Sequence, residues 1–201
     1  MRREDRKTFF DRHAESWDDR LNGGEEQARL SELVDSFGLA AGNAVLDVGT
    51  GTGVLLPFLR ETIGHKGRLT AMDFSFKMLQ QTAERRKVAE ATLLNTSVES
   101  IPLRSGQFDC VTCFAAFPHF PNKEKALHEM VRVLRSGGRL VIAHLKSVEE
   151  INKLHGQIGG AVARDQLPDP EALRLAMEES GLIDISIVNE PGQFIARGRK
   201  A

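Results

Sequence analysis

The stretch AVLDVGTGTGVLLPFLR, residues Ala44 to Arg60, places Gly49, Gly51 and Gly53 at every second position between an apolar run and a segment with helical spacing. A glycine-rich turn between a strand and a helix lets a ligand approach the backbone, and the helix N-terminus offers free N–H groups. The spacing is G-x-G-x-G, not the G-x-G-x-x-G of dinucleotide-binding proteins, and Asp47 precedes the first glycine by two residues. Because an acid there repels a pyrophosphate, the loop suits a ligand with a cation or hydrogen-bond donors.

Apolar runs alternate with helical segments on both sides of this loop. Runs typical of strands cover 44–48, 68–73, 91–97, 108–116 and 139–145. Helical spacing covers 53–63, 75–89 and 123–134 between them. Strands that alternate with helices predict βαβ units and a parallel sheet.

Further segments flank this alternating core. Two helical stretches precede it, at about 3–17 and 25–37, with a turn at 22–24 between them, and another helical stretch follows at 148–162. Together with the core they predict an α/β protein with helices on both faces of a doubly wound, Rossmann-like sheet.

The C-terminal part has its own signals. Asp169 is a suitable N-cap, Pro170 suits the first helical position and Gly181 suits the helix end. The last segment, 182–200, consists of two extended runs joined by a short turn at 190–192. It predicts an antiparallel hairpin that completes a seven-stranded, otherwise parallel sheet.

Length and composition set limits on function. The 201 residues suit one domain, which we divide into an N-terminal helical cap at 1–42, a ligand-binding core at 43–146, a possible lid at 147–168 and a last helix with hairpin at 169–201. The net charge of −1 gives no electrostatic footprint for nucleic acid, so we expect no nucleic-acid partner. No apolar run reaches the roughly 18 residues of a membrane helix, and the N-terminus lacks a signal-peptide pattern, so we expect a cytoplasmic protein without a membrane span.

Two residue types exclude particular chemistries. Cys110 and Cys113 have C-x-x-C spacing but lie in a strand-like run, where residues three apart face opposite sides of the sheet. We expect two reduced, packed thiols. The chain has no tyrosine, which excludes reductases that use a phenol as their acid.

A second acid follows the next strand. Asp73 ends the run 68–73, twenty residues after Gly53. From that position a carboxylate reaches both hydroxyls of a ribose. The ligand predicted by the loop and this acid is a nucleoside without phosphates.

Four segments in order resemble a known family: VLDVGTGTG, LTAMDFSFKML, SVESIPLRSGQFDCVTCFAAFPHF and KALHEMVRVLRSGGRLVIA. They occur in the order and spacing of class I S-adenosylmethionine-dependent methyltransferases, in particular the type-11 small-molecule group, and the likeness runs from about Asp11 to Lys200. The resemblance implies S-adenosylmethionine as cofactor and a small-molecule methyl acceptor. No oligomeric state follows from it.

The resemblance also implies a set of cofactor-binding residues. Its members would hold the methionine part, the ribose and the adenine, or close over them: Asp47, Gly49, Thr50, Gly51, Gly53, Asp73, Phe74, Met78, Ser97, Val98, Phe114 and Trp17. Ser97 departs from the usual Asp, and a neutral hydroxyl accepts a weaker hydrogen bond. His13 and Trp17 match the family's opening segment, which folds over the cofactor.

Histidines follow the strands where the chemistry is expected, because ligands of such sheets bind at the carboxyl ends of the strands. His119 is the candidate catalytic base, and His13, His144 and His155 are candidate substrate contacts with it. The histidines lack the short spacing of a metal-ligand motif, so no metal site is expected. The stretch 148–168 is the candidate lid, which predicts a modest pocket and a small acceptor.

Other classes of protein remain alternatives. One is a non-catalytic module of the same fold that binds S-adenosylmethionine or another nucleoside. A nicotinamide oxidoreductase is disfavoured by the glycine spacing and by Asp47. A nucleic-acid methyltransferase is disfavoured because AAFPHF, residues 115–120, stands where many amino methylases have a PP[YFW] motif.

Overall fold

The computed structural model describes residues 5–20, 23–85 and 89–201. One seven-stranded sheet has the order β3-β2-β1-β4-β5-β7-β6. Its strands are β1 (Ala44–Val48), β2 (Arg68–Asp73), β3 (Thr92–Asn95), β4 (Phe108–Phe114), β5 (Leu134–His144), β6 (Leu182–Glu190) and β7 (Gln193–Lys200). The pairs among β1 to β5 are parallel, and β7 pairs antiparallel with both β5 and β6. The predicted sheet and its C-terminal hairpin are confirmed.

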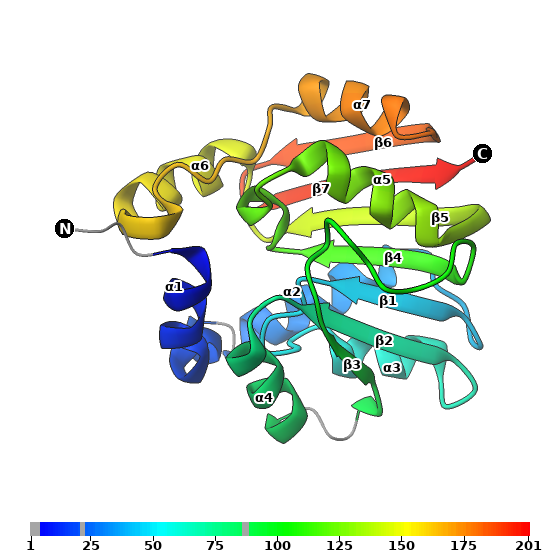
Figure 1. The fold of residues 1–201 in the computed structure, drawn as a ribbon, viewed down its shortest axis with the longest axis horizontal. Coiled ribbons are helices and arrows are strands. Elements are labelled where there is room, and N and C mark those ends of the chain that lie inside the picture. Colours follow the sequence, from blue (N-terminus) through cyan, green and yellow to red (C-terminus); the bar gives the residue numbers. More distant parts are fainter. Residues whose placement is uncertain (1–4, 21–22, 86–88) are drawn as a thin grey trace.

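Helices cover the sheet and one of its ends. The α-helices are α1 (Arg6–His13), α2 (Gly24–Asp35), α3 (Leu56–Ile63), α4 (Phe76–Arg85), α5 (Lys123–Val133), α6 (Val148–Ile158) and α7 (Pro170–Glu179). The 3-10 helices are η1 (Ala14–Arg20), η3 (Phe117–His119) and η4 (Gly160–Val162). Figure 1 shows α5 in front of the sheet, α2 and α3 behind it, and α1 with α6 beyond the end to which β4 and β5 point.

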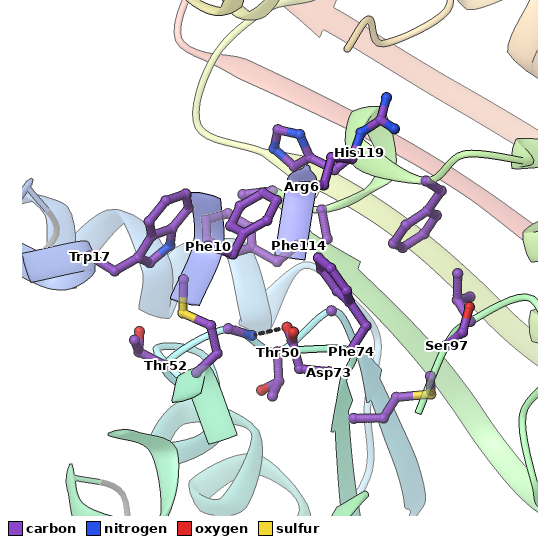
Figure 2. A pocket seen from close by; sticks show the side chains of 18 of the residues that line it. Arg6, Phe10, Trp17, Thr50, Thr52, Asp73, Phe74, Ser97, Phe114 and His119 are labelled. Carbon is purple, nitrogen blue, oxygen red and sulfur yellow. Dashed lines mark hydrogen bonds between the residues drawn. The ribbon is translucent and has the colours of Figure 1, made fainter. Parts of the chain in front are cut away.

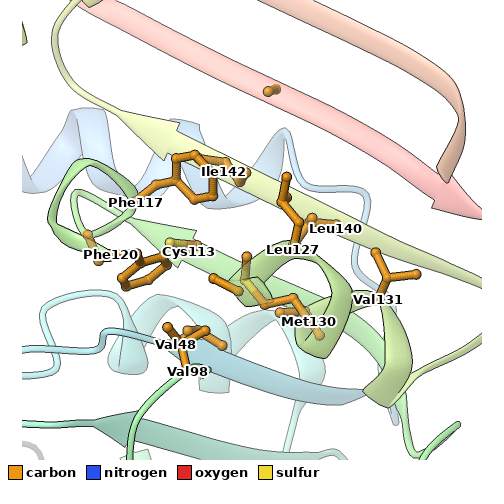
Figure 3. Packing of buried hydrophobic residues seen from close by; sticks show 14 of the residues in the cluster. Val48, Val98, Cys113, Phe117, Phe120, Leu127, Met130, Val131, Leu140 and Ile142 are labelled. Atoms are coloured by element: carbon orange, nitrogen blue, oxygen red, sulfur yellow. The ribbon is translucent and has the colours of Figure 1, made fainter. Parts of the chain in front are cut away.

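Alternation along the buried strands explains why both faces carry helices. In β5, Leu140 and Ile142 join the core cluster that contains Leu127 and Met130 of α5 (Figure 3). Val141 lies on the opposite face, in the cluster that contains residues of α2 and α3. Successive side chains of a strand point to opposite faces, so each face needs its own layer of helices.

The two cysteines follow the same alternation. Cys110 belongs to the cluster behind the sheet and Cys113 to the cluster in front of it, and both are buried free thiols. Burial raises the pKa of Cys110 to about 12 and that of Cys113 well above its usual value. Thiols so reluctant to ionise serve packing, as their spacing in the strand predicts.

Several element bounds differ from the predictions. The helix expected from Gly53 begins at Leu56, because Gly51 and Gly53 have φ values of 56° and 77° that no α-helix contains. The strand expected from Arg139 begins at Leu134, and its register to β4 shifts between Phe108 and Cys110. The helical stretch 148–162 is interrupted at Gly159, which has a φ of 71°. The first helix begins at Arg6, while the expected start at Arg3, turn residue Asn22 and helix residues 86–88 lie outside the described residues.

The last helix follows its sequence signals. The Asp169 side chain accepts hydrogen bonds from the backbone N–H groups of Glu171 and Ala172, and Pro170 is the first helical residue. Gly181, with a φ of 94°, follows the C-cap residue Ser180. The hairpin that comes next turns at Pro191 and Gly192, between β6 and β7.

Strand order also determines where a ligand can bind. β1 lies between β2 and β4, so the chain winds outward from β1 in opposite directions. At such a reversal the loops after neighbouring strands diverge and leave a crevice at the carboxyl ends. The glycine loop after β1 and the segment after β4 therefore border the same space.

Candidate functional site

A cavity of about 490 Å³ opens at the carboxyl ends of β1, β2 and β4 (Figure 2). The residues around it come from the N-terminal segment, from β1, β2, β3 and β4 or the loops that follow them, and from α4, η3 and η4 with the residues next to them. Its lining comprises Asp5, Arg6, Phe10, Trp17, Gly49–Thr52, Val54, Met72–Phe74, Met78, Thr96–Val98, Phe114–Ala116, His119–Pro121, Gly160, Ala161 and Arg164. We call it the first cavity.

The glycine loop borders the first cavity in a conformation that favours glycine. Gly49, Gly51 and Gly53 all have positive φ, from 56° to 77°, and the first two line the cavity while Gly53 does not. A Cβ on Gly49 would lie 2.4 Å from the Cβ of Ala116, so a neighbour within the chain excludes a side chain there. The backbone thus needs glycine at this position even before a ligand is considered.

Asp73 connects the loop to the end of β2. Its Oδ2 accepts a hydrogen bond of 2.9 Å from Gly51 N, and its Oδ1 accepts one of 2.8 Å from Ser75 N. Burial, with a smaller contribution from the charge of Asp47, raises the pKa of Asp73 to about 6. The carboxylate is held rigidly at the cavity wall with acceptor capacity to spare.

Asp47 occupies a different place from the one that the resemblance implies. It is 2% exposed and accepts a hydrogen bond of 2.7 Å from Thr112 Oγ1, and it does not line the first cavity. Burial raises its pKa to about 6. Asp47 is therefore buried beside Thr112 and outside the lining of the first cavity.

The other residues predicted to bind the cofactor, after β2 and β3 and at the end of β4, also line the first cavity. Phe74 is 37% exposed, Met78 is buried, and Ser97 and Val98 follow β3. Ser97 Oγ accepts a hydrogen bond of 3.2 Å from Glu99 N. Phe114 ends β4 and belongs to the same wall.

The N-terminal segment covers this cavity. Trp17 Nε1 lies 3.9 Å from where a Cβ on Gly51 would be. Phe10 is buried between three rings, with centroids 5.3 Å from Trp17, 5.6 Å from Phe74 and 5.0 Å from His119 (Figure 2). Trp17 and Phe10 thus both line the first cavity, and Phe10 makes the ring contacts that connect this segment to the cavity wall.

A second cavity, of about 520 Å³, adjoins the first. Trp17, Phe114, Ala115 and His119 line both cavities. The remaining lining of the second comprises Phe9, His13, Ser16, His144–Lys146, Ile151, Leu154, His155, Ile158 and Val162. The backbone of Ala115 has a φ of 52°, an unfavourable left-handed conformation for a residue with a Cβ, in the wall that the cavities share.

The candidate histidines gather at this second cavity. The rings of His119 and His155 have centroids 4.8 Å apart, and His144 lines the same space from the end of β5. His144 Nε2 is buried without a hydrogen-bond partner among the described residues, and burial lowers the pKa of His144 to about 3. His13 Nδ1 is 2.8 Å from Phe9 O.

Asp165 links His119 to both covering segments. Its Oδ2 lies 2.9 Å from His119 Nδ1, and its carboxylate also pairs with the Arg6 guanidinium of α1. His155 Nδ1 lies 2.6 Å from the carbonyl oxygen of Asp165. Within the described residues, no three His, Cys, Asp or Glu side chains are arranged to hold a metal ion.

Sequence reasoning missed Arg6, Phe10 and Asp165. Arg6 and Asp165 are 159 residues apart, and an isolated Asp in a loop carries no local signal of a partner. Phe10 had a visible signal, because the pair Phe9–Phe10 is apolar within an otherwise charged helix. Three residues of the candidate lid, Gly160, Ala161 and Arg164, line the first cavity.

Comparisons with known proteins agree with this geometry. The family model Methyltransf_11, described as a methyltransferase domain, matches residues 46–142. The ubiquinone/menaquinone biosynthesis C-methyltransferase UbiE of Cronobacter sakazakii is 28% identical over 192 residues, covering 83% of this chain and 76% of that protein. UbiE of Vibrio cholerae is 27% identical over 207 residues, and the match covers 90% of this chain and 80% of the UbiE chain.

Solved structures share the fold. A SAM-dependent methyltransferase from Aquifex aeolicus superposes with a TM-score of 0.73 at 25% identity, covering 94% of this chain and 98% of the other. One from Thermotoga maritima has a TM-score of 0.75 at 18% identity, covering 96% and 98%. None of the described helices is both long and apolar enough to cross a membrane. Taken together, these comparisons support a class I S-adenosylmethionine-dependent methyltransferase.

Proposed function

We propose that this methyltransferase transfers the methyl group to a small, largely apolar molecule bound in the second cavity. The observation that carries the proposal is the wall of four residues that both cavities share. A cofactor in the first cavity and an acceptor in the second would meet at that wall. The methyl group would then pass from one to the other beside these four residues.

The residues of the first cavity suit the cofactor. Asp73 uses one acceptor site of each oxygen for Gly51 N and Ser75 N, which leaves sites for the two hydroxyls of a ribose. The glycine loop offers backbone to the methionine part, while Ser97 and Val98 are available to the adenine. Asp47, outside that lining, would act without direct contact.

The second cavity favours a small acceptor. Phe9, Ile151, Leu154, Ile158 and Val162 give it apolar walls, and α1, α6 and η4 enclose it. A cavity of about 520 Å³ suits a compact molecule, within the usual range of ligand pockets. The UbiE relatives are named as C-methyltransferases of ubiquinone/menaquinone biosynthesis, and this supports a small-molecule acceptor as well.

The chain's own contribution is alignment and exclusion of water. The sulfonium supplies a methyl group that is already activated for in-line displacement, so the protein need not create a better leaving group. Phe10 and Trp17 close the first cavity from one side, and segment 147–168, which we propose as the lid, closes it from another. Holding the two reacting molecules in a dry, fixed geometry lowers the barrier chiefly through entropy. In this proposal residues 1–42 form the cap of a single domain, 1–201.

Calorimetric titration with S-adenosylmethionine and S-adenosylhomocysteine tests the cofactor site. We expect micromolar binding that Asp73→Ala abolishes and that Asp35→Ala, an exposed control at the end of α2, leaves unchanged. Incubation with methyl-labelled cofactor and a panel of small aromatic molecules then tests the acceptor. Unaltered binding in Asp73→Ala would refute the site, and binding without transfer to any small acceptor would favour the non-catalytic alternative.

A further inference from the structure

His119, one of the four residues that line both cavities, forms a buried pair with Asp165. His119 is the last residue of η3, and its side chain is 10% exposed, while that of Asp165 is 0% exposed. The Asp165 carboxylate lies 2.9 Å from His119 Nδ1, and Asp165 has no place in the lining of either cavity. Through the hydrogen bond to His119, the Asp165 carboxylate can act on a residue that lines both cavities without touching an acceptor itself.

The pairing determines which nitrogen of His119 carries the proton. An ionised carboxylate accepts but cannot donate, so Nδ1 must be the protonated nitrogen of the neutral ring. Nε2 then holds a free electron pair, and it makes no hydrogen bond among the described residues. A ring nitrogen with a free pair thus remains available to the space that His119 lines.

The surrounding charges keep this ring neutral and its partner ionised. Burial lowers the pKa of His119, an effect reinforced by His155 and Arg6 and opposed by Asp165. Hydrogen bonds from His119 and Arg6 outweigh the burial of Asp165 and lower its pKa to about 2. His144 of β5 and Lys123 of α5 also interact electrostatically with the pair. At neutral pH the pair is an uncharged imidazole beside a carboxylate.

We propose that His119 removes a proton from the acceptor, that Asp165 is its positioning residue, and that the acceptor therefore carries a weakly acidic hydroxyl group such as that of a phenol or enol. This inference rests on the proposed function. The acceptor's O–H proton passes to Nε2, and the electron pair so released forms the new bond to the methyl carbon. The bond between that carbon and the sulfonium sulfur breaks, and its pair stays on sulfur. The imidazolium, stabilised by Asp165, later returns the proton to water.

We infer a hydroxyl acceptor because it is the acceptor group whose reactivity a general base increases most. An amine has a free pair at neutral pH once it is desolvated, and a thiol ionises readily, so neither needs a paired imidazole. A hydroxyl is a poor nucleophile until it loses its proton, and general-base help is worth about 10²–10⁴ in rate. Proton transfer creates a buried imidazolium, and the charge of the Asp165 carboxylate offsets part of the free-energy cost of burying it.

Phenol, aniline and thiophenol, three acceptors of one size, test this with methyl-labelled cofactor. We expect transfer to phenol, with kcat at least 100-fold lower in His119→Asn and Asp165→Asn, a loss that exceeds any change in cofactor Kd. Thiophenol should react equally with all three proteins. His128→Asn, an exposed control on α5, should behave as wild type. Phenol turnover within threefold of wild type in both variants would overturn the proposal, and so would a pH profile whose acidic limb stays in place in Asp165→Asn.

Nuclear magnetic resonance of the ¹⁵N-histidine-labelled protein tests the pair without any acceptor. His119 should show a protonated Nδ1 and an unprotonated Nε2 at pH 7, with a pKa that falls further in Asp165→Asn. An Nε2-protonated ring, or an imidazolium at pH 7, would overturn the base role. If the spectrum is as expected and cofactor binds, yet none of the three acceptors reacts, the proposed small, apolar acceptor is wrong while the protonation state assigned to His119 stands.

Discussion

Gly49 and Ala116 approach each other so closely that a Cβ on Gly49 would lie 2.4 Å from the Cβ of Ala116. Gly49 follows β1 and Ala116 follows β4, so this contact joins the two loops at the point where the sheet order reverses. The glycine loop is thus built for packing within the chain as well as for a ligand.

Gly49→Ala should destabilise the protein by about 2–5 kcal/mol, the sum of a left-handed backbone with a Cβ and an overpacked contact. Gly106→Ala is the matched control, since Gly106 has a φ of 72° and no atom of the described residues lies within 4 Å of where its Cβ would be. It should cost about 1–2 kcal/mol, from the backbone alone. Urea denaturation measures both, and equal losses in the two variants would disprove the role of Ala116.

Asp47→Asn should make the protein more stable above pH 6. Burial raises the pKa of Asp47 from 3.8 to about 6. Between those values the folded state binds more protons than the unfolded state, so wild-type stability falls as pH rises from about 4 to 6 and is level above. The full pKa shift corresponds to about 3 kcal/mol of folding free energy. The charge of Asp47 in turn raises the pKa of Asp73.

The neutral Asn removes this penalty and can still accept from Thr112. Thermal unfolding at pH 4 and pH 7.5 should therefore show a gain of about 1–3 kcal/mol at pH 7.5 and none at pH 4. Asp35→Asn serves as the exposed control. A variant whose stability keeps the wild-type slope between pH 4 and 6 would contradict the assignment to Asp47.

Phe10→Ala should open the cover of the first cavity without unfolding the sheet. Phe10 contacts Trp17, Phe74 and His119, and its cluster is separate from the two core clusters. We expect faster amide hydrogen exchange over 6–17 and about tenfold weaker cofactor binding, with the exchange of β4 and β5 unchanged. Phe76→Ala, at a 55% exposed position of α4, is the control. Protection of 6–17 that survives in Phe10→Ala would show that other contacts hold the segment.

The fold and the first cavity were largely predictable because their signals are local. The period of apolar residues in β1 to β5, the positive-φ glycines and the cap at Asp169 each depend on neighbours in sequence. The places of Asp47 and Asp165 were not predictable in this way. A pattern of residue types shows that an acid follows a strand, but whether it faces a cavity or is buried outside its lining depends on packing.

The same limit applies to the histidines. Their separation in sequence gave no reason to expect a cluster, and the strand ends alone suggested that His119 and His144 face the same edge. The contact between His119 and His155 arises because α6 folds back over the end of the sheet. Interruption of the helical stretch at Gly159 then brings Asp165 within hydrogen-bond distance of Nδ1 of both rings.

Ser97→Asp should strengthen cofactor binding. Ser97 lines the first cavity and is exposed, at the position where the family resemblance implies an acid. A carboxylate accepts a hydrogen bond about twice as strong as a hydroxyl does, so we expect roughly fivefold tighter binding of S-adenosylhomocysteine. The inosine analogue, which lacks the amino group, should gain nothing. Ser100→Asp controls for added negative charge nearby. An equal gain for both ligands would show that charge alone acts, and no gain for either would place the adenine elsewhere in the cavity.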